Sequence, residues 1–175
     1  MTGTPAPQEP KPASAVASRL ENVERVWQVH GEFGRLPVVA QGDPEPEFAL
    51  LGAFGKLAKD GAGLVANVDF GFRLTALPEA GQDIPEQLVQ KKTGRVILVY
   101  VKASFAITYS LREGPALSEE DVKAFCQVNA VHNAWPFWRE FITSSLARAG
   151  LHGVPVPPFM IQGGVKPPFS RPSQK

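Results

Sequence analysis

The stretch LVANVDFGFRLTAL, residues 64–77, decides the fold because apolar and polar side chains alternate along its whole length. Leu64 and Phe70 fall on one side of an extended chain, and Asn67 and Arg73 fall on the other. A period of two residues is typical of a β-strand that buries one face. The stretch therefore predicts a long antiparallel strand.

Related patterns lie on both sides of residues 64–77. Residues 23–33 and 95–109 alternate in the same way, and residues 48–54 form a short apolar run that we interpret as a further strand. The apolar residues of the first strand share one predicted face: Val23, Trp27, Val29 and Phe33. Residues 34–47 contain several prolines, which remove backbone hydrogen-bond donors, so we expect a loop there. Four strands before any helix favour an α+β fold with an antiparallel sheet.

A long helix is predicted after the strands. Ser118 precedes the acidic run 119–121, a combination typical of a helix N-terminus because the hydroxyl caps a free backbone N–H and the carboxylates meet the positive end of the dipole. Apolar residues then recur every three or four positions over residues 122–146. Pro136 interrupts this pattern. We expect a kink or break near Asn133, whose side chain can cap the second half, and hence a Pro-broken helix packed on one side of the sheet.

The two ends of the chain differ in composition from its middle. Residues 1–18 carry four prolines among small polar residues, and prolines between 155 and 172 exclude another long helix. Such segments have too few apolar groups to offset the entropy of ordering. We therefore expect a disordered Pro-rich tail over residues 1–18, one folded domain over 19–162, and a disordered basic tail over 163–175.

Composition excludes several classes of protein. Lys and Arg number 18 against 17 Asp and Glu, which gives a net charge of +1 and none of the basic excess that nucleic-acid binding uses to neutralise phosphates. No apolar stretch approaches the length of a membrane span, and the N-terminus lacks the apolar run of a secretory signal. Cys126 is the only cysteine and has no partner for an internal disulfide. We expect a cytoplasmic protein that neither binds nucleic acid nor inserts into a membrane.

Residue types that carry catalysis or hold metals are scattered. His30, His132 and His152 lack the spacing of a helical metal site. Cys126 falls within a helical apolar stripe, where a buried structural thiol is a commoner role than a nucleophile. Glycines between residues 52 and 63 lack the lysine and hydroxyl of a phosphate-binding loop. We expect no enzymatic activity, no metal and no cofactor, and a small-molecule site in the sheet is the least favoured alternative.

Aromatic side chains concentrate in the helical run WPFW, residues 135–138. Trp135, Phe137 and Trp138 point to different sides of a helix, so one apolar stripe cannot bury all three. We expect at least one of them to meet another subunit or an apolar ligand.

The longer run WPFWREFITSSLARAG, residues 135–150, resembles the long helix of the SecB export-chaperone family. That family has an aromatic-Pro-aromatic step, then Arg-Glu, an Ile-Ser pair and Arg-Gly at the helix end. The following VPVPPF, residues 154–159, resembles its extended segment ending in Pro-Val-Asn-Phe, although the Asn is absent here. The order of strands, crossover-like loop and helix also agrees, so the resemblance covers roughly residues 20–160.

The resemblance implies an ATP-independent chaperone, or holdase, that binds non-native polypeptides in apolar grooves and assembles as a dimer or a dimer of dimers through its long helices. Catalysis is not implied. On this basis we expect client binding around the crossover-like loop, at Trp27, Phe33, Leu36, Val38, Val39 and Phe159. We expect the oligomer interface on the aromatic helix, at Phe125, Trp135, Phe137, Trp138 and Phe141.

Charge limits what the resemblance carries over. Export members of the family dock the SecA motor through a strongly acidic surface, whereas this chain is nearly neutral and ends in Lys166, Arg171 and Lys175. This charge disfavours SecA as a partner. Three functions stay open: a holdase linked to protein export, a SecB-like chaperone of a toxin–antitoxin system, and a non-chaperone homo-oligomeric module that binds one dedicated protein.

Overall fold

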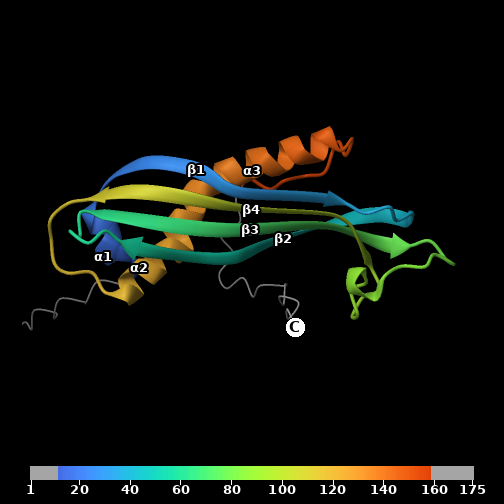
Figure 1. The fold of residues 1–175 in the computed structure, drawn as a ribbon, viewed down its shortest axis with the longest axis horizontal. Helices are drawn as coiled ribbons and strands as arrows, with labels where there is room; N and C mark the ends of the chain where they lie inside the picture. Colours follow the sequence, from blue (N-terminus) through green and yellow to red (C-terminus); the bar gives the residue numbers. More distant parts are fainter. Residues whose placement is uncertain (1–11, 159–175) are drawn as a thin grey trace, which may run out of the picture.

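A four-stranded antiparallel sheet, crossed on one face by a long helix, makes up most of the protein (Figure 1). The computed structural model describes residues 12–158. The strands lie in the order β1-β4-β3-β2, so β1 and β2 form the two edges. Their bounds are β1 Leu20–Arg35, β2 Ala40–Leu57, β3 Gly63–Pro78 and β4 Val96–Leu111. The α+β class predicted from the sequence is confirmed.

The second strand is much longer than the sequence predicted. The expected loop over residues 34–47 is wrong, because only residues 36–39 separate β1 from β2. β2 contains Pro44 and Pro46, which an edge strand tolerates because only one of its two rows of backbone groups must pair. A bulge between Gln41 and Glu45, with Gly42 at φ 73°, absorbs the irregular backbone.

The core lies between the sheet and the helix. The even-numbered residues of β3 predicted to share one face are buried there, which confirms the interpretation of residues 64–77. Phe70 is a central member of this core. Its ring packs edge-on against Phe105 and Trp135 and lies parallel to Trp138 of the helix, with ring centroids 6.2, 5.7 and 5.4 Å away. Aromatic packing therefore fixes the helix on the sheet.

The helix begins where the sequence predicted. Ser118 Oγ accepts a 3.1 Å hydrogen bond from the Asp121 backbone N–H, and the Ser118 N–H donates to the Asp121 carboxylate at 2.9 Å. This capping box satisfies two N–H groups at the start of the helix. Three segments then join without a loop: α2 Glu119–Phe125, the π-helical η2 Cys126–Ala130, and α3 Val131–Arg148.

The irregular point of the helix is not at Asn133. α3 continues through Pro136, and the departure from α geometry is the earlier segment η2. A break capped by Asn133 is therefore wrong. The Asn133 side-chain Nδ2 instead donates to Tyr109 Oη of β4 at 3.0 Å, which attaches the helix to the sheet.

The N-terminal part of the described chain is helical. Residues 1–18 were expected to be a disordered tail, yet Pro12–Arg19 forms α1, which packs against α2. Val16 of α1 is completely buried. Burial of this apolar side chain stabilises α1, although the composition of residues 1–18 did not predict a folded segment. The remaining predicted tail, residues 1–11, and the predicted basic tail over 163–175 lie outside the described residues. Within residues 12–158, the helices all fall short of the length and apolar character needed to cross a membrane.

Candidate functional site: a groove beneath a crossover segment

The chain must pass from one edge of the sheet to the other between β1 and β2. Only residues 36–39, which we name the crossover segment, make this passage over the ends of β4 and β3. Neighbouring strands lie about 4.8 Å apart, so three spacings amount to about 14 Å. Five residue-to-residue steps join Arg35 to Ala40, and a fully extended chain covers about 17 Å in five steps. The short crossover segment is therefore long enough for the passage, with room for the turn in which the Val38 N–H donates to Leu36 O.

Backbone hydrogen bonds fix this segment at both ends. The Leu36 N–H donates to Leu98 O of β4 at 2.8 Å, and the Val39 carbonyl accepts from the Glu79 N–H, just after β3, at 3.1 Å. The segment thus lies across the ends of the two central strands.

An apolar groove of about 370 Å³ lies beneath the crossover segment, and we name it the crossover groove. Leu74 of β3 and Val99 of β4 are buried residues of the core face and line it together with the crossover segment. Among the residues that the structure describes, the groove is lined by Arg35, Leu36, Pro37, Val38, Val39, Pro44, Leu74, Leu98, Val99 and Leu151. Arg35 is the one charged residue in that set. Such a surface binds by burying apolar side chains rather than by orienting a polar group.

Arg35 also ties the groove to the helix. Its Nη1 donates a 3.0 Å hydrogen bond to the carbonyl of Ala149, at the C-terminal end of α3. Carbonyl groups at a helix C-terminus carry partial negative charge, so a guanidinium is favoured there. Leu151, two residues further on, lines the groove.

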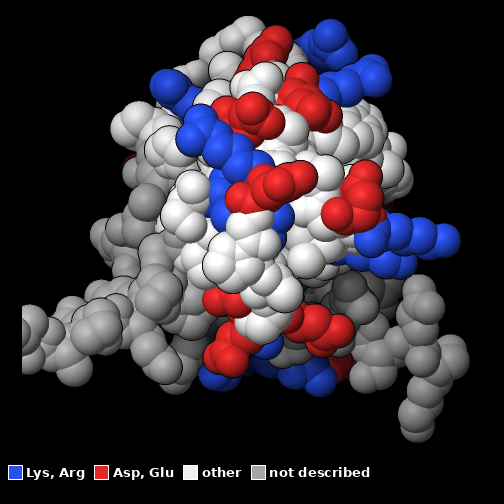
Figure 2. Space-filling model, turned by 90° about the vertical axis from the view of Figure 1, so that its left-hand side faces the viewer, with Lys and Arg blue, Asp and Glu red and all other residues white. Residues whose placement is uncertain are grey.

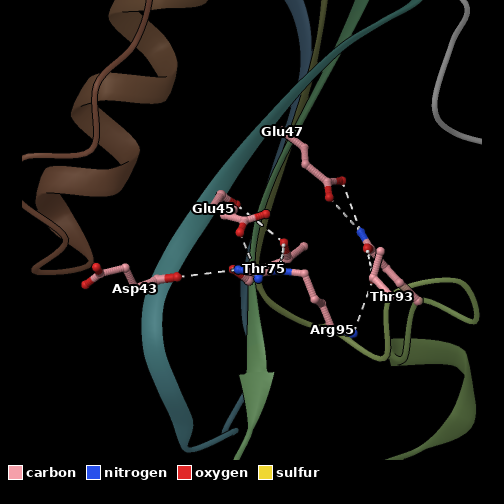
Figure 3. Close-up of polar contacts among 7 residues, drawn as sticks. Asp43, Glu45, Glu47, Thr75, Thr93 and Arg95 are labelled. Carbon is pink, nitrogen blue, oxygen red and sulfur yellow. Dashed lines mark hydrogen bonds and ion pairs between the residues drawn. The ribbon is translucent and has the colours of Figure 1, made fainter.

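A polar network holds the β2 bulge beside the groove (Figure 3). The Arg95 guanidinium forms a 2.9 Å ion pair with Glu45 and donates to the carbonyls of Thr75 at 2.9 Å and Asp43 at 3.4 Å. Pro44, which lines the groove, lies between Asp43 and Glu45. Arg95 therefore bonds to the residues on both sides of Pro44, which keeps Pro44 in place at the groove.

The structure brings together half of the predicted client-binding set. Leu36, Val38 and Val39 line the crossover groove. Phe33 shares the helix-facing side of the sheet with its β4 partner Val101, but it is not among the lining residues. Phe159 lies outside the described residues.

Trp27 lies on the other face of the sheet. Its β4 partner is Ala106, whose side chain points away from the helix, and the Arg25 guanidinium lies 5.4 Å from the centre of the Trp27 ring. The prediction that Trp27 and Phe33 share a face is wrong because a bulge between Gln28 and His30 adds one residue. One added residue reverses the facing of every side chain beyond it.

Sequence reasoning missed the other half of the groove. Leu74 and Val99 were expected only as core residues, and Pro44, Leu98 and Leu151 were not singled out. Their convergence depends on the strand order, which places β4 and β3 under the crossover segment.

Most aromatic side chains of the helix pack in the core of their own protomer. Phe125 and Trp138 are completely buried and Trp135 nearly so, which corrects their predicted place at an oligomer interface. Phe141 is half-buried where β1 has Gly31, whose missing side chain leaves room for the Phe141 ring. Phe137 is 42% exposed. Phe137 and Phe141 stay predicted interface residues.

A second hollow, of about 1050 Å³, lies between the last residues of β2 and α2. These two segments lie at the other end of the sheet (Figure 1). We name it the edge groove. Leu57, Leu117 and Val122 line it, and Phe54 lies at its surface, 56% exposed. Lys56 and several charged residues of α2 also line it. Acidic and basic side chains are interspersed on this end of the molecule (Figure 2).

The buried titratable groups are structural. Burial raises the pKa of the Cys126 thiol to about 11, so the thiol stays protonated and unreactive near neutral pH. Burial also raises the pKa of Tyr109 to about 12, while its hydrogen bond with Asn133 acts in the opposite direction. Within residues 12–158, His, Cys, Asp and Glu side chains do not gather into a group of three able to hold a metal ion.

Comparison with known proteins finds a similar fold among solved structures but no match by sequence. No protein-family model matches the sequence, and no curated protein matches it. Among solved structures, Mycobacterium tuberculosis Rv1957, a SecB-like chaperone in complex with a ChAD peptide from the Rv1956 HigA1 antitoxin, is similar with a TM-score of 0.57. The similarity covers 83% of this chain and 95% of that one at 15% sequence identity. This chain has a SecB-like fold. The resemblance of residues 135–150 to the SecB helix is thereby confirmed at the level of the fold.

Proposed function

We propose that this protein is an ATP-independent chaperone that holds non-native polypeptides, with the crossover groove as part of its binding surface. The observation that carries the proposal is an apolar groove, bordered by exposed and half-buried side chains of the crossover segment, on a SecB-like fold. Catalysis, a metal and a nucleotide play no part in it.

The groove supports a weak and tolerant mode of binding. Burial of one large apolar side chain contributes about 1.5–3 kcal/mol, whatever the sequence around it. A groove of about 370 Å³ therefore holds any one client segment only loosely. The edge groove and the sheet-edge strands β1 and β2 offer further contacts, since an extended peptide can pair with an exposed strand. Several such contacts on one unfolded chain give useful affinity.

Service to one dedicated polypeptide is the second candidate function. Rv1957 is bound to a ChAD peptide of an antitoxin, which favours a toxin–antitoxin role over bulk export. The net charge of +1 and the interspersed charges in Figure 2 disfavour docking to SecA through an acidic surface. Cytoplasmic location and self-association through Phe137 and Phe141, as a dimer or dimer of dimers, complete the proposal.

Suppression of aggregation tests the holdase. A chemically unfolded, aggregation-prone protein is diluted from denaturant with increasing amounts of this protein and without nucleotide, and light scattering is followed. We expect scattering to be suppressed near stoichiometric ratios for several unrelated clients. Unchanged scattering for all clients would overturn the proposal, and suppression for a single client would favour the dedicated-partner function.

The groove itself is tested by the double variant Leu36→Ser with Val38→Ser. We expect it to suppress aggregation less well than the wild type, because two apolar side chains are lost from the binding surface. Val65→Ser is the matched control: Val65 is an exposed valine of β3 that faces away from the groove. Equal activity of the double variant and the control would remove the crossover groove from the binding surface.

A further inference from the structure

Val39, the last residue of the crossover segment, is held by a glutamine from another part of the chain. Gln82 belongs to the loop between β3 and β4. This loop and the crossover segment lie at the same end of the sheet (Figure 1). Its Nε2 donates a 2.7 Å hydrogen bond to the Val39 carbonyl, and its Oε1 accepts a 3.1 Å hydrogen bond from the Val39 N–H. One side-chain amide thus satisfies both backbone groups of Val39.

This pairing imitates a neighbouring strand. In an antiparallel ladder a residue exchanges two N–H···O bonds with the residue opposite, and the Gln82 amide supplies the same donor and acceptor. The Val39 carbonyl also accepts from the Glu79 N–H at 3.1 Å, which uses its second lone pair. The backbone of Val39 is therefore fixed while its side chain is 60% exposed at the groove.

Fixing Val39 matters because the crossover segment has few other attachments. Leu36 bonds to Leu98 at its start, and Val38 N–H donates to Leu36 O at 2.9 Å within the segment. Pro37 limits the backbone further by fixing φ. A segment held at both ends presents its apolar side chains in one arrangement, so a client does not have to order it on binding.

We propose that Gln82 is a positioning residue for polypeptide binding, which acts through the backbone of Val39 and contacts no client itself. This inference rests on the proposed function of the crossover groove. The β3–β4 loop is then part of the binding apparatus, although Gln82 is not among the residues that line the groove.

Three single variants test the inference. Gln82→Ala removes both bonds to Val39, and Gln82→Glu keeps an acceptor for the Val39 N–H but places a carboxylate oxygen against the Val39 carbonyl. Gln87→Ala is the matched control, an exposed glutamine of η1 (Glu86–Leu88) in the same loop. The probe is fluorescently labelled α-lactalbumin that has been reduced and carboxymethylated so that it stays unfolded, and affinity is measured by anisotropy.

We expect both Gln82 variants to weaken binding by between about twofold and tenfold, which corresponds to the net contribution of a single hydrogen bond, and Gln87→Ala to bind like the wild type. Hydrogen exchange supplies the second readout. In Gln82→Ala the Val39 N–H should exchange faster while the amides of β3 and β4 keep wild-type protection. A purely structural role would loosen the sheet amides as well.

The outcomes separate this inference from the proposed function. If the wild type does not bind the probe, the proposed function fails. If the wild type binds, Leu36→Ser with Val38→Ser weakens binding and Gln82→Ala does not, the positioning role is wrong and the groove stands. Weaker binding of Gln82→Ala with unchanged exchange at Val39 would also overturn the inference, because the effect would not pass through Val39.

Discussion

The ring of Trp138 in α3 lies flat against the ring of Phe70 in β3, with ring centroids 5.4 Å apart and planes 11° from parallel. Both side chains are almost completely buried. This pair lies in the middle of the core that joins the helix to the sheet. The stability of the protein should therefore depend strongly on Trp138 and weakly on its exposed neighbour.

We expect Trp138→Ala to lower the free energy of unfolding by about 3–5 kcal/mol, because it leaves a large cavity against Phe70. At a protein concentration low enough to keep protomers apart, Phe137→Ala, one position away on the exposed side of α3, should change stability by less than about 1 kcal/mol. Urea unfolding measures both values. Equal losses for the two variants would mean that Phe137 is buried in solution, as a helix-mediated dimer requires, and sedimentation velocity would then show self-association.

Arg95→Ala should destabilise the protein by about 1–3 kcal/mol, since it removes donors from the buried Thr75 as well as an ion pair with Glu45. Arg95→Lys should recover only part of the loss, because an ammonium cannot bond as a planar fork. The control is Lys91→Ala, which breaks an exposed ion pair with Glu86 and should change stability by at most about 0.5 kcal/mol. Similar effects of Arg95→Ala and Lys91→Ala in urea unfolding would contradict the role of the network in Figure 3.

Two glycines of β2 should respond differently to alanine. A Cβ at Gly55 would lie 2.6 Å from Cys126 Sγ and 3.2 Å from Val122 Cγ1, so Gly55→Ala forces the strand and helix apart and should cost about 1–3 kcal/mol. A Cβ at Gly52 meets nothing closer than Asp69 Oδ2 at 3.5 Å. Gly52→Ala should therefore change stability by less than about 0.5 kcal/mol. Thermal unfolding of both variants checks the close approach of β2 to the helix.

Stability should fall as the pH rises above 9. Burial raises the pKa of Cys126 from its ordinary value of 9.0 to about 11, so the unfolded chain loses this proton before the folded protein does. The stabilising contribution is complete below pH 9 and is lost as pH rises toward 11, at up to about 1.4 kcal/mol per pH unit. Tyr109, with a pKa raised to about 12, extends the decline to higher pH.

Urea unfolding at pH 8 and pH 10.5 measures this decline. Cys126→Ala removes the thiol and should lose less stability between the two pH values than the wild type. An identical loss in both proteins would show that Cys126 is not the group that titrates.

Alternation alone predicted the centre of the sheet correctly, because β3 and β4 are paired on both sides and pack against the helix on one face. It failed at the edges. In β1 the bulge before His30 separates Trp27 from Phe33, and in β2 the chain pairs through Pro46 with Leu74 despite its prolines. Bulges and prolines at an edge depend on which backbone groups have a partner, and strand order decides that.

The groove was half predictable for the same reason. Leu36 and Val38 belong to one short segment, which the resemblance to the SecB family identified as a crossover-like loop. Leu98 and Leu151 reach the groove only because β4 lies next to β1 and because α3 ends beside Arg35. Neither arrangement leaves a local pattern in the sequence. The pairing of Gln82 with Val39, 43 positions away, is equally invisible to local patterns.

The anchoring of residues 36–39 at both ends has a consequence for the timing of client release. Because Leu36 and Val39 are both hydrogen-bonded to neighbouring parts of the chain, we expect the crossover groove to bind and release a client without a lid that opens and closes. Departure of a client from this groove would then be set by how weakly each segment adheres and by how fast the freed segment folds. If the proposed holdase function is right, the protein would act as a buffer for unfolded chains, from which fast-folding clients leave and on which slow-folding clients stay.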